Sequence, residues 1–255
     1  MTSYKRLLIT GAAGSIGKTL CSAWEKNPYY KLTRCDIRKE GDNDDSIEIA
    51  DVRDYARMRE LCINKDVLVH LAYIPQIHLG KVKNEMSDIS ANIALFEAAR
   101  ESGVKRIIFA STNHVTGVNE RSVPPKLSKG NEFRPDSWYG AMKGMAEIAG
   151  RYLVDHSDMT FFSIRIGTFD GKNNAETMRT CSTLLTPRDC VQLFSRAIDY
   201  RGSERYLVTY GTSGNFTSYH IGYLDITEAI NILGYKPVDN LMEKDGPKHL
   251  SQKSK

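Results

Sequence analysis

Two side chains that could move a proton together lie four residues apart. On a helix, Tyr139 and Lys143 would stand on one face as neighbours. An ammonium near a phenol stabilises the phenolate and lowers the pKa of the tyrosine, which makes the tyrosine a usable general base. The same spacing also occurs on solvated helix faces, so a catalytic role requires that the pair lie beside a ligand site.

A predicted strand provides such a place. The apolar run 106–110 predicts a strand, and Ser111 and Thr112 follow at its end. Open α/β sheets bind their ligands at the carboxyl ends of parallel strands. We therefore expect Thr112 to hydrogen-bond the reacting hydroxyl of a substrate, next to Tyr139 and Lys143.

A glycine-rich turn near the N-terminus has the spacing of a dinucleotide-binding loop. Gly11, Gly14 and Gly17 lie between a short apolar run, 6–10, and a helical pattern that starts at Ile16. The first glycine permits a tight turn, the second lets a pyrophosphate approach backbone N–H groups, and the third lets helix and sheet pack closely. The turn predicts a bound dinucleotide.

An acidic residue indicates which dinucleotide this would be. Asp36 ends the next predicted strand, about 20 residues after the last glycine, where a carboxylate accepts the ribose hydroxyls of NAD and repels the 2′-phosphate of NADP. Arg34 and Arg38 lie close in sequence, and an arginine can receive a 2′-phosphate. The sequence favours NAD and leaves NADP open.

Alternating apolar runs and helical periods position these residues. They predict an α/β fold with a parallel sheet and crossover helices. We expect a single domain over 1–245, with a substrate cap built from about 113–136, 167–186 and 210–245, and a polar tail at 246–255. The predicted strands are 6–10, 30–36, 46–49, 67–71, 106–110, 161–166 and 205–210. The predicted helices include one from Ser87 to Arg100, one capped by Ser137, one starting at Pro187, and one that follows capping-box spacing at Asp225–Glu228 and stops at Gly234.

Composition excludes several other classes of protein. The 255 residues are 41% hydrophobic and 26% charged, which is enough for a buried core. The net charge of +4 is interspersed along the chain, so nucleic acid is not an expected partner. The five cysteines show no C-x-x-C spacing, so we expect neither disulfides nor a metal site. No run is long enough to span a membrane and no signal peptide is evident, so we expect a cytoplasmic protein.

Several short motifs together carry a family resemblance. Thr10–Gly17, Asp51-Val52, His70-Leu71-Ala72, Ser111-Thr112 and Tyr139-x-x-x-Lys143 resemble the extended short-chain dehydrogenase/reductase family over nearly the whole chain. The resemblance implies a Rossmann-type, doubly wound parallel sheet, the cofactor NAD, and a catalytic triad of Thr112, Tyr139 and Lys143. The cofactor contacts that we expect are Gly11, Gly14, Ser15, Ile16, Gly17, Asp36, Asp51, Val52, Leu71, Ala72, Tyr139 and Lys143.

Within that family, three segments look most like uronate dehydrogenases. These segments are Phe109–His114, Arg134–Gly140 and Ile164–Thr168. The resemblance implies oxidation of a hexuronate, such as glucuronate or galacturonate, to its aldarolactone at the anomeric carbon. It places Thr112, Asn113, His114 and Thr168 at the sugar and Arg179 on its carboxylate, which a planar guanidinium can grip through two hydrogen bonds. His114 can equally be a loop histidine that never touches substrate.

Departures from the pattern leave other substrates and roles open. Tyr73–Gln76 stands where those dehydrogenases tend to have a small polar residue, and Asp88 stands where the family commonly has Asn. A dehydrogenase of a neutral aldose or a sugar phosphate, such as glucose 6-phosphate, is the nearest alternative. A nucleotide-sugar epimerase or dehydratase is less favoured, because only 88 residues follow Gly167. A non-catalytic NAD-sensing regulator is also less favoured, because both Tyr139 and Lys143 are present.

The resemblance also implies an oligomer. In many relatives, the helix that carries Tyr139 and the helix at 87–100 form dimer contacts. We therefore expect a homo-oligomer that uses these two helices.

Overall fold

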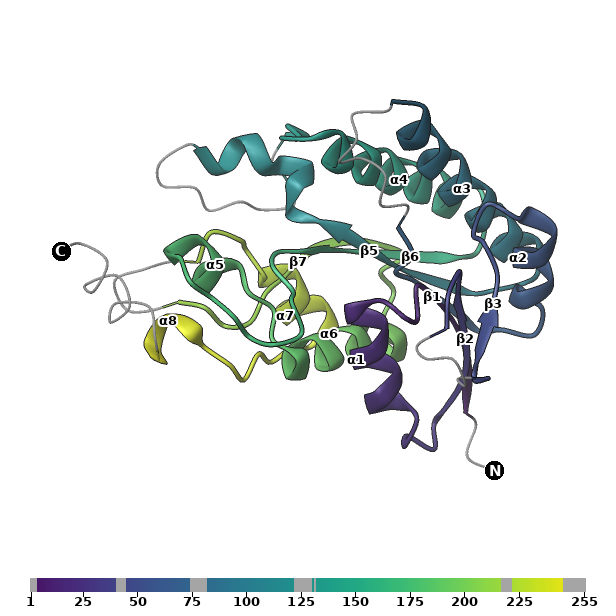
Figure 1. Cartoon of the computed structure of the whole chain (residues 1–255), viewed down its shortest axis with the longest axis horizontal. Helices are drawn as coiled ribbons and strands as arrows, with labels where there is room; N and C mark the ends of the chain where they lie inside the picture. The colour runs from purple at the N-terminus through teal and green to yellow at the C-terminus, as the bar shows by residue number, and fades with distance from the viewer. Residues whose placement is uncertain are drawn as a thin grey trace.

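One parallel sheet organises the chain (Figure 1). The computed structural model describes residues 4–39, 45–73, 82–121, 130, 132–216 and 222–244. The seven strands follow the order β3-β2-β1-β4-β5-β6-β7, and every neighbouring pair is parallel. Their bounds are β1 Lys5–Thr10, β2 Tyr30–Asp36, β3 Ile47–Ile49, β4 Val67–His70, β5 Arg106–Thr112, β6 Thr160–Ile166 and β7 Tyr206–Gly211.

The strand order reverses at β1. From β1 the chain runs outward through β2 to β3, and it then returns to pair β4 with the other side of β1. In doubly wound sheets the crevice at the carboxyl ends beside this reversal binds the ligand. The prediction of a doubly wound, Rossmann-type sheet is confirmed.

Helices cover both faces of the sheet (Figure 1). On one face, α1 (Ser15–Trp24), α6 (Pro187–Asp199) and α7 (Thr227–Leu233) enclose an apolar core that includes Trp24 and Phe194. On the other face, α2 (Tyr55–Cys62), α3 (Val82–Glu101) and α4 (Trp138–Asp155) enclose a second core that includes Phe96 and Leu153. Two short helices, α5 (Met178–Thr183) and α8 (Leu241–Lys244), contact each other in the C-terminal region.

The helix termini follow the predicted signals with two exceptions. The Ser137 side chain accepts a hydrogen bond from the Gly140 N–H and caps α4, and Gly234 ends α7 with a φ of 68°. The predicted capping box at Asp225–Glu228 does not form. Helix α7 starts at Thr227, and the Asp225 carboxylate instead accepts from the Thr227 backbone N–H at 3.0 Å. Helix α3 begins at Val82, earlier in the chain than the predicted Ser87.

Two segments of the predicted substrate cap, 113–136 and 167–186, contain short helices. Asn113–Arg121 forms the 3₁₀ helix η2, and Met178–Thr183 forms α5, which is capped reciprocally by Thr177 and Thr180. Such short elements carry too few residues for a visible apolar period. Residues 122–129, 131, 217–221 and 245 of the predicted cap, and the predicted tail at 246–255, lie outside the described residues.

All five cysteines are buried as free thiols. Burial raises the pKa of the Cys35 and Cys62 thiols to about 12. Within the described ranges, no group of three or more His, Cys, Asp or Glu side chains could hold a metal ion. No helix in that part of the chain is long and apolar enough to cross a membrane.

Candidate active site

Close backbone contacts require glycine at two positions of the N-terminal turn. Gly11 has a φ of 74°, and a Cβ there would lie 2.6 Å from the backbone N of Ala72. A Cβ on Gly17 would lie 2.3 Å from the carbonyl oxygen of Gly11, because α1 packs directly on the turn. Ser15 and Ile16 are the first two residues of α1, so their backbone N–H groups lie at the helix N-terminus.

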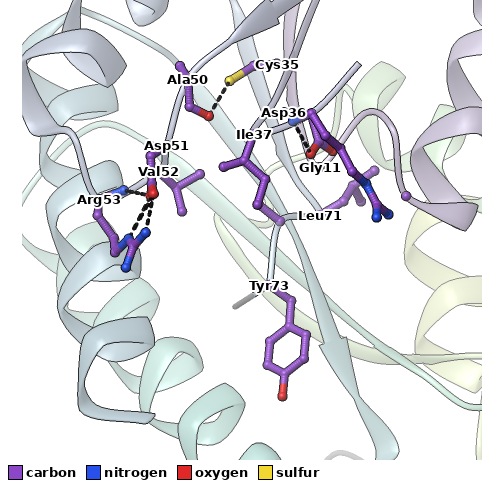
Figure 2. A pocket seen from close by; sticks show the side chains of 13 residues that line it. Gly11, Cys35, Asp36, Ile37, Ala50, Asp51, Val52, Arg53, Leu71 and Tyr73 are labelled. Atoms are coloured by element: carbon purple, nitrogen blue, oxygen red, sulfur yellow. Dashed lines mark hydrogen bonds and ion pairs between the residues drawn. The ribbon is translucent and has the colours of Figure 1, made fainter. Parts of the chain in front are cut away.

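The turn forms one wall of a cavity of about 440 Å³ (Figure 2). The cavity lies at the carboxyl ends of β1, β2, β3 and β4, beside the reversal of strand order. Seven of the predicted cofactor residues line it: Gly11, Gly14, Asp36, Asp51, Val52, Leu71 and Ala72. Arg38, considered above as a ligand of a 2′-phosphate, also lines it, as do five residues that were not predicted: Cys35, Ile37, Ala50, Arg53 and Tyr73. Ser15, Ile16, Gly17, Tyr139 and Lys143 are not among the lining residues.

Asp36 is held by the glycine turn. Its carboxylate accepts hydrogen bonds from the backbone N–H of Ala13 at 2.9 Å and of Arg38 at 3.3 Å. Of the two arginines that could admit NADP, Arg34 pairs with Glu25 at 2.9 Å and does not line the cavity, whereas Arg38 does.

Asp51 has a partner that sequence reasoning missed. Its carboxylate forms an ion pair with Arg53 and accepts from the Arg53 backbone N–H at 2.9 Å (Figure 2). The hydrogen bond from the Arg53 guanidinium lowers the pKa of the Asp51 carboxyl group. Figure 2 shows Asp36 and Asp51 on opposite sides of the cavity, with Ile37 and Val52 between them and Leu71 below Asp36. An apolar slot with a carboxylate at each side suits an adenosine group.

The predicted triad residues come together at the end of β5. Thr112 is the last residue of β5, and Tyr139 and Lys143 lie in the first two turns of α4. Burial raises the pKa of the Tyr139 phenol, while a hydrogen bond with Thr112 lowers it. The sequence predicted that Lys143 would lower this pKa. In the structure burial outweighs the other effects, and the Lys143 ammonium lies 6.0 Å from the centre of the Tyr139 ring.

Lys143 is itself buried, with only 2% of its surface exposed. Its ammonium lies 4.6 Å from the centre of the Phe109 ring. Burial lowers the pKa of Lys143, and the nearby carboxylates of Asp88 and Glu147 raise it. The two acidic side chains therefore help to keep a charge in this buried position.

Tyr73 connects the cavity to the triad. It lines the cavity, and its ring centre lies 4.8 Å from that of Tyr139 in an edge-on arrangement. Tyr73 is the first residue of the segment 73–76 that departs from the uronate dehydrogenase pattern, and the rest of that segment lies outside the described residues.

Three of the predicted sugar residues, Asn113, Thr168 and Arg179, make contacts in two separate groups. Asn113 donates from Nδ2 to Glu120 at 2.5 Å, and Arg179 donates from Nε to the other oxygen of Glu120 at 2.8 Å. Separately, the hydroxyls of Thr168 and Thr183 lie 2.8 Å apart. Glu120, which joins Asn113 to Arg179, was not predicted, because it lies in a segment without a clear period.

His114 lies between Tyr139 and a carboxylate. Its ring centre is 6.0 Å from that of Tyr139, and its Nδ1 lies 2.9 Å from each oxygen of Asp136. Because a carboxylate only accepts, Nδ1 carries the hydrogen and Nε2 is left for another partner. The arrangement is compatible with either a substrate contact or a structural loop histidine.

Comparison with known proteins places this site in a family. The profile of the NAD dependent epimerase/dehydratase family matches residues 7–188, which include the glycine turn, the cavity and the triad. The chain belongs to the NAD-dependent epimerase/dehydratase family.

Curated relatives from this family include dehydrogenases of different sugars. A uronate dehydrogenase of Pseudomonas syringae pv. tomato is 33% identical over 227 residues, which cover 85% of this chain and 77% of the relative. An NAD-dependent glucose-6-phosphate dehydrogenase of Haloferax volcanii is 30% identical, with 93% and 94% covered. An L-arabinose 1-dehydrogenase (NAD(P)(+)) of Haloferax volcanii is 30% identical, with 92% and 97% covered.

A solved structure agrees with the fold and the cofactor. A mutant of uronate dehydrogenase from Agrobacterium tumefaciens, complexed with NAD, superposes with a TM-score of 0.77 at 25% identity and covers 99% of this chain and 91% of that one. The close contacts at Gly11 and Gly17, together with the two carboxylates around the cavity, fit the NAD cofactor of the family.

A buried ion pair supports the predicted triad from behind. Glu147 lies one turn after Lys143 and is fully buried, and it pairs with Arg165 at 2.7 Å. The same carboxylate accepts from the Ser111 and Ser163 hydroxyls at 2.6 and 3.0 Å. The pair therefore ties α4 to the carboxyl ends of β5 and β6, which fixes Thr112 relative to Tyr139.

Proposed function

We propose that this protein oxidises a free sugar at its anomeric carbon with NAD. The observation that carries the proposal is the position of Tyr73, which lines the dinucleotide cavity and packs edge-on against Tyr139 at 4.8 Å. In this proposal Thr112, Tyr139 and Lys143 lie beyond the Tyr73 end of the cavity, and the nicotinamide half of the cofactor would bind there. Bound there, the nicotinamide would supply the acceptor for the hydride that leaves the anomeric carbon.

The chain's own groups move the proton. Tyr139, as phenolate, takes the proton from the anomeric hydroxyl, and Thr112 holds that hydroxyl in place. Lys143 keeps a positive charge near the phenolate and binds the nicotinamide ribose. Loss of a hydride and a proton converts the cyclic hemiacetal into a lactone. In this proposal the glycine turn and Asp36 hold the pyrophosphate and the adenosine ribose, and Asp51 and Val52 contact the adenine.

Which sugar binds depends on the side chains around Thr112. A hexuronate requires that Arg179 be available to its carboxylate, and Asn113, His114 and Thr168 would bind its hydroxyls. A neutral aldose requires hydroxyl contacts only, and a sugar phosphate requires a cationic site. A nucleotide sugar would need further space in the 88 residues after Gly167, which already supply α5, α6, β7 and α7.

The test is NADH formation across a panel of uronic acids, aldoses and sugar phosphates. We expect at least one free sugar to be oxidised, and Tyr139→Phe to lose nearly all turnover while NAD binding, measured by calorimetry, persists. Tyr29→Phe is the control, because Tyr29 lies outside the triad and the cavity and is 54% exposed to solvent. Normal turnover by Tyr139→Phe would refute the triad assignment. NAD binding without turnover of any sugar would favour the regulator instead.

A further inference from the structure

Glu120 forms an ion pair with Arg179, the residue that the family resemblance places on a uronate carboxylate. Its Oε2 accepts from Arg179 Nε at 2.8 Å, and its Oε1 accepts from Asn113 Nδ2 at 2.5 Å. The Glu120 side chain is 11% exposed and that of Arg179 is 44% exposed. The positive charge of Arg179 is therefore already balanced by the carboxylate of Glu120, a residue of η2.

Asn113 adds a second acceptor to the same place. The residue is 1% exposed, and its Oδ1 has no hydrogen-bond partner among the described residues. Because Nδ2 faces the Glu120 carboxylate, the orientation of the amide is fixed by its hydrogen bond. A buried acceptor without a donor is costly, so this oxygen favours a ligand that brings a hydrogen.

Asn113 Oδ1 and the Glu120 carboxylate both accept hydrogen bonds, so they favour a ligand group that donates one. A sugar hydroxyl can donate to Asn113 Oδ1, whereas an ionised carboxylate only accepts. A uronate bound at Arg179 would place two carboxylates against one guanidinium, or would displace Glu120 from its bonds to Arg179 and Asn113. Either case weakens the binding of the uronate, whereas a neutral sugar avoids both. Repulsion against the wrong ligand is a common source of specificity.

We infer that Glu120 is a specificity-determining residue that makes the site select a neutral aldose over a hexuronate or a sugar phosphate. The inference rests on the proposed oxidation of a free sugar and names the substrate class of that same site. In this arrangement Arg179 positions Glu120, and Asn113 and Glu120 receive hydroxyl hydrogens of the sugar.

The experiment compares pairs of substrates that differ at one carbon. D-Galactose is matched with D-galacturonate and D-glucose with D-glucuronate and glucose 6-phosphate, and kcat/KM is measured from NADH formation. For the wild-type protein we expect kcat/KM to be at least about tenfold higher for the better neutral sugar than for its charged partner. Glu120→Gln removes the charge and is expected to shift this ratio at least about tenfold toward the uronate. Glu176→Gln is the matched control, because Glu176 is an exposed glutamate just before α5.

The outcomes separate this inference from the proposed function. Faster oxidation of a uronate or a sugar phosphate than of its neutral partner by the wild-type protein overturns the inference and leaves the proposed function standing. An unchanged ratio in a folded Glu120→Gln variant, checked by its melting temperature, also overturns it. The absence of turnover with every sugar, while NAD still binds, overturns the proposed function and the inference with it. The wild-type comparison requires no variant to fold.

Discussion

The backbone N–H of Ala13 donates a hydrogen bond to the Asp36 carboxylate at 2.9 Å. The glycine turn therefore orients the carboxylate that we propose binds the adenosine ribose. This bond fixes the carboxylate before any cofactor arrives. It also couples the two parts of the cavity that the sequence predicted separately, the turn after β1 and the acidic end of β2.

The first prediction concerns cofactor choice. We expect the wild-type protein to use NAD at least about tenfold better than NADP, and Asp36→Ala to raise the KM for NAD about tenfold or more, because charged hydrogen bonds contribute about 1.5–3 kcal/mol. Arg38→Gln should lower residual use of NADP, since Arg38 lines the cavity. Arg34→Gln is the control, because Arg34 is already paired with Glu25. Preference of the wild type for NADP would contradict the assignment.

The second prediction concerns the pH profile of turnover. Burial and the negative charge of Asp88 raise the pKa of Tyr139, so phenolate forms at alkaline pH and kcat/KM should rise as the pH increases. Asp88→Asn removes one of these causes, and the rise should move to lower pH. A profile that is the same in wild type and Asp88→Asn would argue against the carboxylate acting on Tyr139.

A third prediction tests the buried ion pair. Glu147→Gln leaves Arg165 as a buried charge without its partner, and we expect the free energy of unfolding to fall by about 3–5 kcal/mol. Asp155→Asn breaks the exposed pair with Arg151 and should cost less than about 1 kcal/mol. Urea denaturation of both variants measures the difference. Equal losses would mean that burial of the Glu147 pair contributes little.

The fourth prediction concerns stability in acid. Burial lowers the pKa of His70 from 6.5 to about 3, helped by the charge of Lys143 and opposed by the bond to Asn92. Between these two pH values His70 binds a proton in the unfolded chain but not in the folded protein. The contribution of neutral His70 to the free energy of unfolding is therefore complete above pH 6.5 and is lost as the pH falls toward 3. Urea unfolding between about pH 7 and pH 4 should show this loss, and His70→Gln should flatten it. A slope that does not change in His70→Gln would refute the role of His70.

The fifth prediction concerns assembly. Helix α4 exposes Trp138, Met145, Ile148 and Tyr152, and the neighbouring α3 exposes Ile93. We propose that this surface forms a homodimer, and we expect light scattering to give twice the chain mass. Ile148→Asp should produce monomers, whereas Val238→Asp, at a similarly exposed position, should leave the mass unchanged. A monomeric wild type at micromolar concentration would contradict the proposal.

Much of the sheet and of the cofactor site could be predicted from sequence. Apolar runs and glycine spacing are local signals, and they placed all seven strands, the turn at Gly11–Gly17 and the acidic residue at the end of β2. Asp51 and Val52 follow β3 and were found through the family resemblance alone. Both line the cavity.

The missed features depend on contacts between distant segments. Nothing near Glu120 in the sequence indicates that Arg179, 59 residues later, would pair with it. Arg53 was missed for a different reason, because an arginine after Asp51 carries no signal until the two side chains are seen to pair. The spacing of Tyr139 and Lys143 predicted their common face correctly, but spacing alone carries no information on burial, which sets the direction of the Tyr139 pKa shift.

Chemical labelling of the buried thiols can measure local opening of the fold. With the pKa of Cys35 and Cys62 raised to about 12, almost no thiolate exists at neutral pH, and neither sulfur reaches solvent in the folded state. Cys62 does not line the cavity, so an alkylating reagent can modify it only while α2 is transiently open. The rate of labelling would report the population of the open state, and a bound dinucleotide that stabilises the closed state would lower that rate.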